Sequence, residues 1–369
     1  MDSSSWAAYS KIDPELEALI PHLPPHKSFA DYPDVLAVRA TIDQMVAEGI
    51  KAGVFQLPDL TGIAVEKIQI PVRDGATIGA LVYRSETAKP GPLIVYNHGG
   101  GFTFGSADNW VNSSKMAVNE LGAVVVSIDY RLAPEISFPV SVNDGWDALK
   151  WAAENAESLG ADPTKGFIVA GTSAGGNVAA VAAHEAVDAN LSPPLTGVYL
   201  SVPLLTHQDA IPEEYRQHHN SEEQNKDARI LDKRGMDWFW GIHLDPNYCK
   251  TVIDNPSEQY KPDTKSHLAS PLWWPGGHKK QPATYIQICG YVVFPCTDED
   301  TDDSSSQDPL RDDSLIYEHF LKEAGVPVKT DVYAGIPHAS TAFMPMLSKS
   351  KKAAEDLKVG LQWILDQKA

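Results

Sequence analysis

Short, almost continuous apolar runs alternate with segments of helical periodicity, and this alternation restricts the possible folds more than any other feature. The apolar runs are "LIVYNH", "AVVVSIDY", "GFIVAG", "VYLSVP", "TYIQIC" and "TDVYAG". Between the second and third runs, Val142, Trp146, Leu149 and Ala153 recur on one face at helical spacing. Apolar strands separated by helices are typical of a parallel sheet buried on both faces. The pattern predicts an α/β fold with a mostly parallel central sheet flanked by helices.

The remaining segments divide the chain. Before the alternation, "EKIQIPV" and "TIGALVYR" flank Asp74-Gly75, which predicts a β-hairpin. Asp13-Pro14 opens a short helical pattern, and a second covers Val35–Ala52. The alternation lapses over a polar stretch with aromatic clusters. We therefore expect four parts: residues 1–55, the N-terminal helical part of a cap; 56–204, the first part of the core; 205–270, an inserted cap or lid segment; and 271–369, the second part of the core.

Charge and cysteine usage exclude several classes of protein. With 30 basic against 49 acidic residues the net charge is -19, so we expect no nucleic-acid or anionic-membrane surface. No apolar stretch approaches the ~20 residues of a membrane span. The first residues lack a basic region followed by an apolar run, so we expect no secretory signal and a cytoplasmic protein. Cys249, Cys289 and Cys296 form no C-x-x-C pair, which argues against a disulfide framework or a zinc site.

The most informative motif is "GFIVAGTSAGGNVAA". An apolar run ends at Ala170, residues 171–175 match G-x-S-x-G, and a helical pattern follows at once. A sharp strand-to-helix turn of this kind forces its serine into a strained conformation and exposes the hydroxyl at the edge of the sheet. The alternative is a Gly-rich turn with an incidental serine. We predict that Ser173 is a nucleophile.

A second motif, "YNHGGGFTFGS", follows an apolar run upstream of the serine. Consecutive glycines let backbone N–H groups face a ligand without an intervening Cβ, and such donors stabilise the oxyanion of acyl transfer. We expect the N–H groups of Gly100, Gly101 and Ala174 to form an oxyanion hole. His98 and Gly99 belong to the same loop, where we expect His98 to order it by hydrogen bonding. A phosphate-binding loop is the alternative, but no G-x-x-x-x-G-K-[ST] pattern is present.

The order Ser, Asp or Glu, His then predicts the other members of a triad. "YAGIPHAST" places His338 in the loop after the last strand, where a base can reach the serine. The histidine pair His218-His219 lies among Glu and Asn residues, and we expect a solvated turn there rather than a metal site.

The orienting acid is expected just beyond the preceding strand. Asp308 of "DPLRDD" is the candidate, while Asp312 and Asp313 open the next helix and suit its dipole. Four other aspartates are alternatives for the orienting acid, but they lie in a segment without a helical or strand pattern that would hold them: Asp298, Asp300, Asp302 and Asp303.

Together, HGGGF, "DYRLAPE" (Asp129–Glu135), GTSAGG, DPLRD and the late PH resemble the hormone-sensitive-lipase-type branch of the α/β-hydrolases, from about Lys67 onward. The resemblance implies an α/β-hydrolase fold with a helical cap, Ser173 as nucleophile, Asp308 as triad acid and His338 as base. It implies no cofactor and no metal. "YRLAPE" is expected to hold the loop and helix behind the site.

One departure from that family is an insert. In the family the glycine at the strand end lies next to the Asp-containing tetrad, but here Tyr291–Ser306 intervenes, and its removal leaves "QICGQDPLRDD". Gly-Tyr-Val can be encoded with a GTACGT splice-donor sequence, and Ser-Ser can contain a TAG acceptor. We hypothesise that the insert is a retained short intron; a real flexible loop, which folds tolerate at modest cost, is the alternative.

The expected activity is hydrolysis of a small-molecule carboxylic ester, by an esterase or deacetylase of specialised metabolism. Phe102, Phe104 and Trp238 are candidate substrate contacts, with cap-to-core packing as the equal alternative. Two other functions stay open: a non-catalytic small-molecule receptor of the same fold, which His338 disfavours, and an accessory hydrolase that releases thioester-bound intermediates. Natural substrate, pathway and oligomeric state do not follow from these residues.

Overall fold

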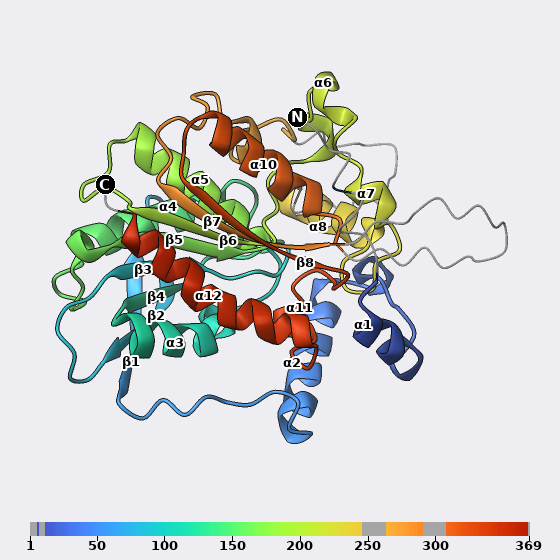
Figure 1. Cartoon of the computed structure of the whole chain (residues 1–369), viewed down its shortest axis with the longest axis horizontal. Coiled ribbons are helices and arrows are strands. Elements are labelled where there is room, and N and C mark those ends of the chain that lie inside the picture. Colours follow the sequence, from blue (N-terminus) through green and yellow to red (C-terminus); the bar gives the residue numbers. More distant parts are fainter. Residues whose placement is uncertain (1–5, 7–11, 246–262, 291–307, 368–369) are drawn as a thin grey trace.

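A computed structural model describes residue 6 and residues 12–245, 263–290 and 308–367 (Figure 1). Its strands form one eight-stranded sheet in the order β1-β2-β4-β3-β5-β6-β7-β8. The strands are β1 (Ile63–Pro71), β2 (Thr77–Ser85), β3 (Leu93–Asn97), β4 (Val124–Asp129), β5 (Phe167–Thr172), β6 (Gly197–Ser201), β7 (Ala283–Gly290) and β8 (Val328–Ala334). The predicted α/β-hydrolase fold is confirmed.

The hairpin and the parallel strands are paired as their sequence patterns predict. β1 and β2 are antiparallel, from Ile63 opposite Ser85 to Pro71 opposite Thr77. Their turn is closed by the Gly75 N–H, which donates to Val72 O at 3.0 Å, and the φ of +86° at Gly75 favours glycine. β2 is antiparallel to β4, and the other neighbouring pairs are parallel.

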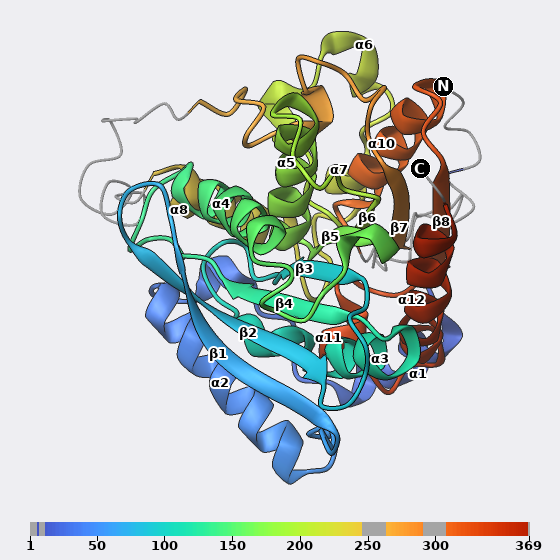
Figure 2. The same ribbon diagram turned by 90° about the vertical axis from the view of Figure 1, so that its left-hand side faces the viewer.

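Helices cover both faces of the sheet, as Figure 2 shows. On one face, apolar side chains of α4 (Val140–Glu154), α5 (Ala174–Asp188) and α10 (Arg311–Glu323) form a continuous core with the strands. On the other face, α3 (Val111–Leu121) and α12 (Ser348–Asp366) pack in the same way. This two-sided burial explains why the parallel strands have no polar alternation.

Two further groups of helices come from the N-terminal segment and from the inserted segment. The N-terminal ones are α1 (Pro14–Leu19), η2 (Ile20–His22), η3 (Phe29–Asp31) and α2 (Val35–Lys51). The inserted segment contributes η6 (Gln208–Ala210), α6 (Glu213–Arg216), α7 (Ser221–Gln224) and α8 (Lys233–Leu244). The two groups meet where Ser28 Oγ donates to Asp232 Oδ1 at 2.8 Å and Arg234 contacts Asp31 at 2.7 Å. The four-part division of the chain stays a prediction.

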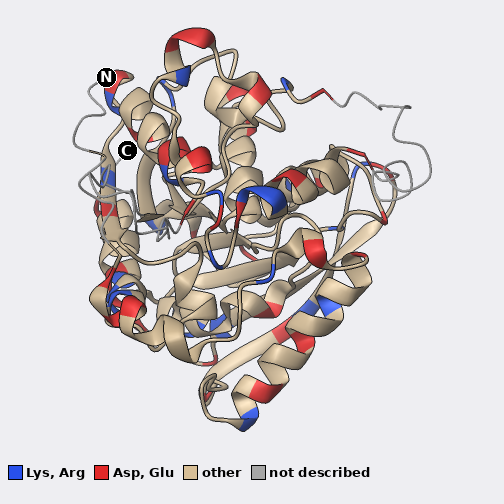
Figure 3. Ribbon diagram, turned by 90° about the vertical axis from the view of Figure 1, so that its right-hand side faces the viewer, with Lys and Arg blue, Asp and Glu red and all other residues tan. Residues whose placement is uncertain are grey.

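Four more short elements complete the description: η4 (Ala107–Trp110), η5 (Pro163–Lys165), η7 (Pro271–Trp273) and α11 (Ser340–Phe343). Of the helices in the described ranges, none has the length and hydropathy of a membrane span. Acidic and basic side chains are interspersed on the outer helices, α2 among them (Figure 3).

A buried ion pair fastens the segment after β4 to α4. Asp144 is fully buried and accepts hydrogen bonds from the Arg131 backbone N–H at 3.0 Å, from Nε at 2.9 Å and from Nη2 at 2.7 Å. The opposite side of the same guanidinium contacts Asp74 of the hairpin turn at 2.7 Å, but Asp74 is 47% exposed. Arg131 therefore joins the hairpin turn, β4 and α4.

We expect Asp144→Asn to lower the free energy of unfolding by about 3 kcal/mol, because it leaves a guanidinium without its buried partner. Asp74→Asn is the matched control on the same arginine, and its exposure limits the loss to less than about 1 kcal/mol. Urea unfolding followed by tryptophan fluorescence measures both. Equal losses in the two variants would contradict the argument from burial.

Candidate active site

Ser173 lies in a strained turn between β5 and α5. Its φ of 56° and ψ of -120° are unusual for a residue with a side chain. The turn is held on both sides, since the Ser173 N–H donates to Ser201 O at 2.9 Å and the Leu204 N–H donates to Ser173 O at 3.2 Å. Glycine is required two residues after the serine: a Cβ on Gly175 would lie 2.2 Å from Asn97 O. The motif therefore presents the Ser173 hydroxyl at the edge of the sheet.

The structure brings together the three residues predicted to form a triad. His338 Nε2 lies 2.9 Å from Ser173 Oγ, and His338 Nδ1 lies 3.0 Å from Asp308 Oδ1. The carboxylate is fully buried and also accepts the Leu310 N–H at 2.9 Å. With Asp308 as acceptor on one side, the neutral imidazole carries its proton on Nδ1, and its unprotonated Nε2 faces the Ser173 hydroxyl.

The Gly-rich loop approaches the serine with its backbone turned outward. Gly100 and Gly101 have φ values of +124° and +56°, and a Cβ on Gly100 would lie 2.1 Å from Phe104 O. Across the described ranges, no residue accepts a hydrogen bond from the N–H groups of Gly100, Gly101 or Ala174. Among the described residues, nothing therefore competes with a ligand for these three donors.

His98 holds the Gly-rich loop as a neutral side chain. Burial lowers the pKa of His98 to about 4. The neutral ring lies 2.8 Å from Gly99 O through Nδ1, which donates because a carbonyl only accepts. The ring stacks on Tyr130 at 4.2 Å between centroids, and the Tyr130 hydroxyl donates to His98 O at 2.6 Å. "YRLAPE" supports the same loop, because the Ala133 N–H donates to Phe102 O at 2.9 Å.

The three candidate substrate contacts differ in their surroundings. Phe102 is 1% exposed and stacks on His243 with the ring centroids 3.7 Å apart, so its side chain packs the cap against the core. Phe104 is half-buried, and its ring centroid lies 6.0 Å from that of Phe239. Trp238 is buried and meets Phe239 edge-on at 5.1 Å. Substrate contact by Phe104 and Trp238 stays a prediction.

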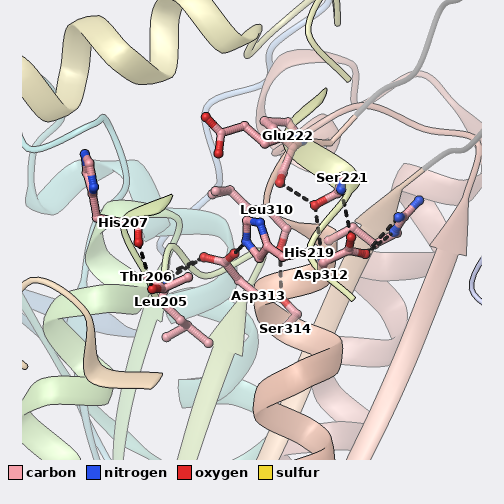
Figure 4. Close-up of polar contacts among 12 residues, drawn as sticks. Leu205, Thr206, His207, His219, Ser221, Glu222, Leu310, Asp312, Asp313 and Ser314 are labelled. Atoms are coloured by element: carbon pink, nitrogen blue, oxygen red, sulfur yellow. Dashed lines mark hydrogen bonds and ion pairs between the residues drawn. The ribbon is translucent and has the colours of Figure 1, made fainter. Parts of the chain in front are cut away.

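The expectation of a solvated turn at His218-His219 is wrong for His219. Its side chain is 7% exposed, and Nε2 lies 2.7 Å from Asp313 Oδ1 (Figure 4). Asp313 is itself buried, and its other oxygen accepts the N–H groups of Leu205 at 2.8 Å and Thr206 at 3.1 Å. Asp313 thus joins the cap to the loop after β6, a function that its position in the first turn of α10 does not reveal.

No set of three or more His, Cys, Asp or Glu side chains in the described ranges could hold a metal ion. Cys289 is free and buried, and burial raises the pKa of its thiol. Cys249 and Cys296 lie outside the described residues, as do the insert Tyr291–Ser306 and the four rival aspartates within it.

The described residues on either side of the insert lie close together. A Cβ on Gly290, the last residue of β7, would lie 3.2 Å from Arg311 Cβ at the start of α10. Each side also has its own anchor: the Gly335 N–H donates to Gly290 O at 2.7 Å, and the Asp308 N–H donates to Asn225 Oδ1 at 2.9 Å. Asp308 is therefore held in place by contacts that do not involve residues 291–307.

Comparisons with known proteins agree with this geometry. Residues 94–299 match a protein family described as having the alpha/beta hydrolase fold. An AB hydrolase superfamily protein of Schizosaccharomyces pombe is 34% identical over 97% of this chain and 95% of its own length. Versiconal hemiacetal acetate esterase of Dothistroma septosporum is 34% identical over 82% of each chain. The crystal structure of vibralactone cyclase has 30% identity and a TM-score of 0.79 over 98% of this chain and 96% of its own.

The His219–Asp313 pair predicts a pH-dependent contribution to stability. Burial alone would lower the pKa of His219, but the hydrogen bond and charge of Asp313, with Asp312 and Glu222, raise it. Because the pKa of His219 is higher in the folded state, the pair stabilises the folded protein fully at pH values below the unfolded pKa of about 6.5. This contribution is lost as the pH rises through the folded pKa.

We therefore expect the melting temperature of the wild type to exceed that of His219→Gln most at pH 6. The difference should shrink by about 1–2 °C or more towards pH 9. Scanning calorimetry of both proteins in matched buffers measures it. A difference that stays constant from pH 6 to pH 9 would show that His219 does not titrate in this range.

Proposed function

The chain belongs to the hormone-sensitive-lipase-like family of α/β-hydrolases and is a carboxylic ester hydrolase, and we propose that it acts through an acyl-enzyme on Ser173. One observation carries the proposal: Ser173 Oγ lies 2.9 Å from His338 Nε2, and the other ring nitrogen lies 3.0 Å from Asp308. This chain of contacts supplies a nucleophile, a base and an orienting carboxylate in one line.

In the proposed first step, Ser173 Oγ attacks the ester carbonyl while His338 Nε2 takes the hydroxyl proton. Asp308 keeps the proton of the neutral ring on Nδ1 and stabilises the imidazolium that forms. The tetrahedral intermediate collapses when His338 returns the proton to the leaving alcohol. Water then attacks the acyl-enzyme by the same route, with His338 again as base.

The proposed oxyanion hole consists of the N–H groups of Gly100, Gly101 and Ala174. The negative charge develops on the former carbonyl oxygen, and a preorganised donor there is worth about 3–4 kcal/mol in transition-state stabilisation. Two features support the assignment: these N–H groups have no acceptor in the described part of the chain, and Ala174 begins α5 directly after the nucleophile. The N-terminus of α5 adds a favourable dipole.

The substrate proposed is a small-molecule ester of specialised metabolism, with a short acyl group such as acetate. The relative from Dothistroma septosporum is a versiconal hemiacetal acetate esterase, and it is similar to this chain over 82% of its length. The aromatic side chains of the cap support an apolar alcohol part, since Phe104, Trp238 and Phe239 gather beside the Gly-rich loop.

We expect Ser173→Ala and Asp308→Asn each to lower kcat for p-nitrophenyl acetate by about 10³-fold or more, because the first removes the nucleophile and the second fixes the wrong tautomer of His338. The matched control is Ser158→Ala, at an exposed serine whose hydroxyl donates only to Asn155 O, at 2.8 Å, among the described residues. Release of p-nitrophenol measures all three. Full activity of Ser173→Ala would refute the proposed mechanism.

Deletion of Tyr291–Ser306 tests the intron hypothesis. We expect the shortened chain to keep kcat for p-nitrophenyl acetate within about 3-fold of the full chain, because the anchors of Gly290 and Asp308 lie outside the deleted segment. Each protein is measured beside its Ser173→Ala variant. An inactive shortened chain beside an active full chain would show that the insert is a functional loop, and sequencing the transcript would decide the origin independently.

A further inference from the structure

The cap helix α7 lies against the loop that carries Asp308. Ser221, its first residue, is fully buried. Its hydroxyl donates to Pro309 O at 2.6 Å and accepts the Asp312 N–H at 3.2 Å. A single hydroxyl from the inserted segment therefore contacts the backbone of residues 308–310, here called the acid loop, and the backbone of the first turn of α10.

Asn225, just past the end of α7, contacts the same loop one residue earlier. It is fully buried, and its Oδ1 accepts the Asp308 N–H at 2.9 Å. Its Nδ2 donates to the backbone oxygen of Ser221, which fixes the orientation of the amide. The backbone on both sides of the Asp308–Pro309 peptide is thus hydrogen-bonded to cap side chains.

Asp312 completes the attachment from the core. Its Oδ2 accepts the N–H groups of Asn220 and Ser221, each at 2.7 Å, at the start of α7, where backbone N–H groups have no acceptor within the helix. Figure 4 shows the contact between Asp312 and Ser221. Its Oδ1 accepts from Arg311 Nε at 2.8 Å. The cap therefore binds α10 through Asp312, and it binds the acid loop through Ser221 and Asn225.

The Asp308 carboxylate has few contacts of its own. Oδ1 accepts from Leu310 N and from His338, while Oδ2 has no hydrogen-bond partner among the described residues. No neighbouring side chain other than His338 binds this carboxylate in the described ranges. Its direction is therefore set by the backbone of residues 308–310, where the cap contacts lie.

We propose that Ser221 and Asn225 are positioning residues, which hold Asp308 in line with His338 from the cap. The inference rests on the proposed role of Asp308 in the triad. It gives the inserted segment a role in the alignment of the triad. A displacement of 1 Å at a catalytic group can cost about 10²-fold in rate, so loss of either contact should reduce turnover.

The test is a double-mutant cycle on the full chain, with p-nitrophenyl acetate as substrate. We expect Ser221→Ala and Asn225→Ala each to lower kcat by about 10-fold or more and to leave KM within about 2-fold, because both side chains are fully buried against the backbone around Asp308. Asn220→Ala is the matched control: within the described ranges its side chain donates only to Gln217 O, at 2.9 Å, and its backbone contact to Asp312 remains. Melting temperatures establish whether each variant is folded. If one of the two variants does not fold, the other still tests the inference.

The decisive comparison is Ser221→Ala in the Asp308→Asn background. A residue that acts through Asp308 should change kcat there by less than about 2-fold, whereas a general structural role would lower it by the same factor in both backgrounds. The second result would overturn the inference, as would wild-type turnover of both single variants. If Asp308→Asn itself keeps full activity, the triad assignment is overturned as well. If Asp308→Asn is impaired and the effects of Ser221→Ala and Asp308→Asn on kcat are additive, the positioning role is overturned and the triad assignment stands.

Discussion

Parallel pairing of the central strands is the constraint on which the site depends. Parallel strands end at the same edge of a sheet, and here the register brings those ends level: Asn97 of β3 pairs with Gly171 of β5, and Gly290 of β7 pairs with Ala334 of β8. The Gly-rich loop, the serine, the acid loop and His338 all follow these ends. Turns directly after the strand ends can therefore place these segments beside one another at one edge of the sheet.

The fold and the central residues of the site were predictable because local rules govern them. Continuous apolar strands separated by helical periods predict a parallel sheet, and G-x-S-x-G between a strand and a helix predicts an exposed serine. Phe102 shows what local reasoning leaves open. Beside a glycine loop its ring resembles a pocket wall, yet it stacks on His243 of the inserted segment. Only the tertiary arrangement decides between the two, since either environment accepts an aromatic ring.

The polar contacts of the cap were unpredictable for a related reason. His219 and Asp313 are 94 positions apart, and Ser221 and Pro309 are 88 apart. A histidine among Glu and Asn residues has the composition of a solvated turn, and an aspartate in a first helical turn is explained by the dipole alone. The first explanation is wrong for His219 and the second is incomplete for Asp313, because the fold brings each side chain a partner that is distant in the sequence.

The acid loop shows how stability and function divide between neighbouring carboxylates. Asp308, Asp312 and Asp313 are all buried, and a buried charge is unfavourable unless hydrogen bonds or opposite charges compensate it. Asp312 has two backbone N–H groups and Arg311; Asp313 has two backbone N–H groups and His219. Asp308 alone keeps an oxygen without a partner in the described ranges. The two compensated carboxylates attach the cap, and the cap in turn contacts the backbone beside Asp308. In the proposed mechanism, this leaves the charge of Asp308 to stabilise the imidazolium of His338.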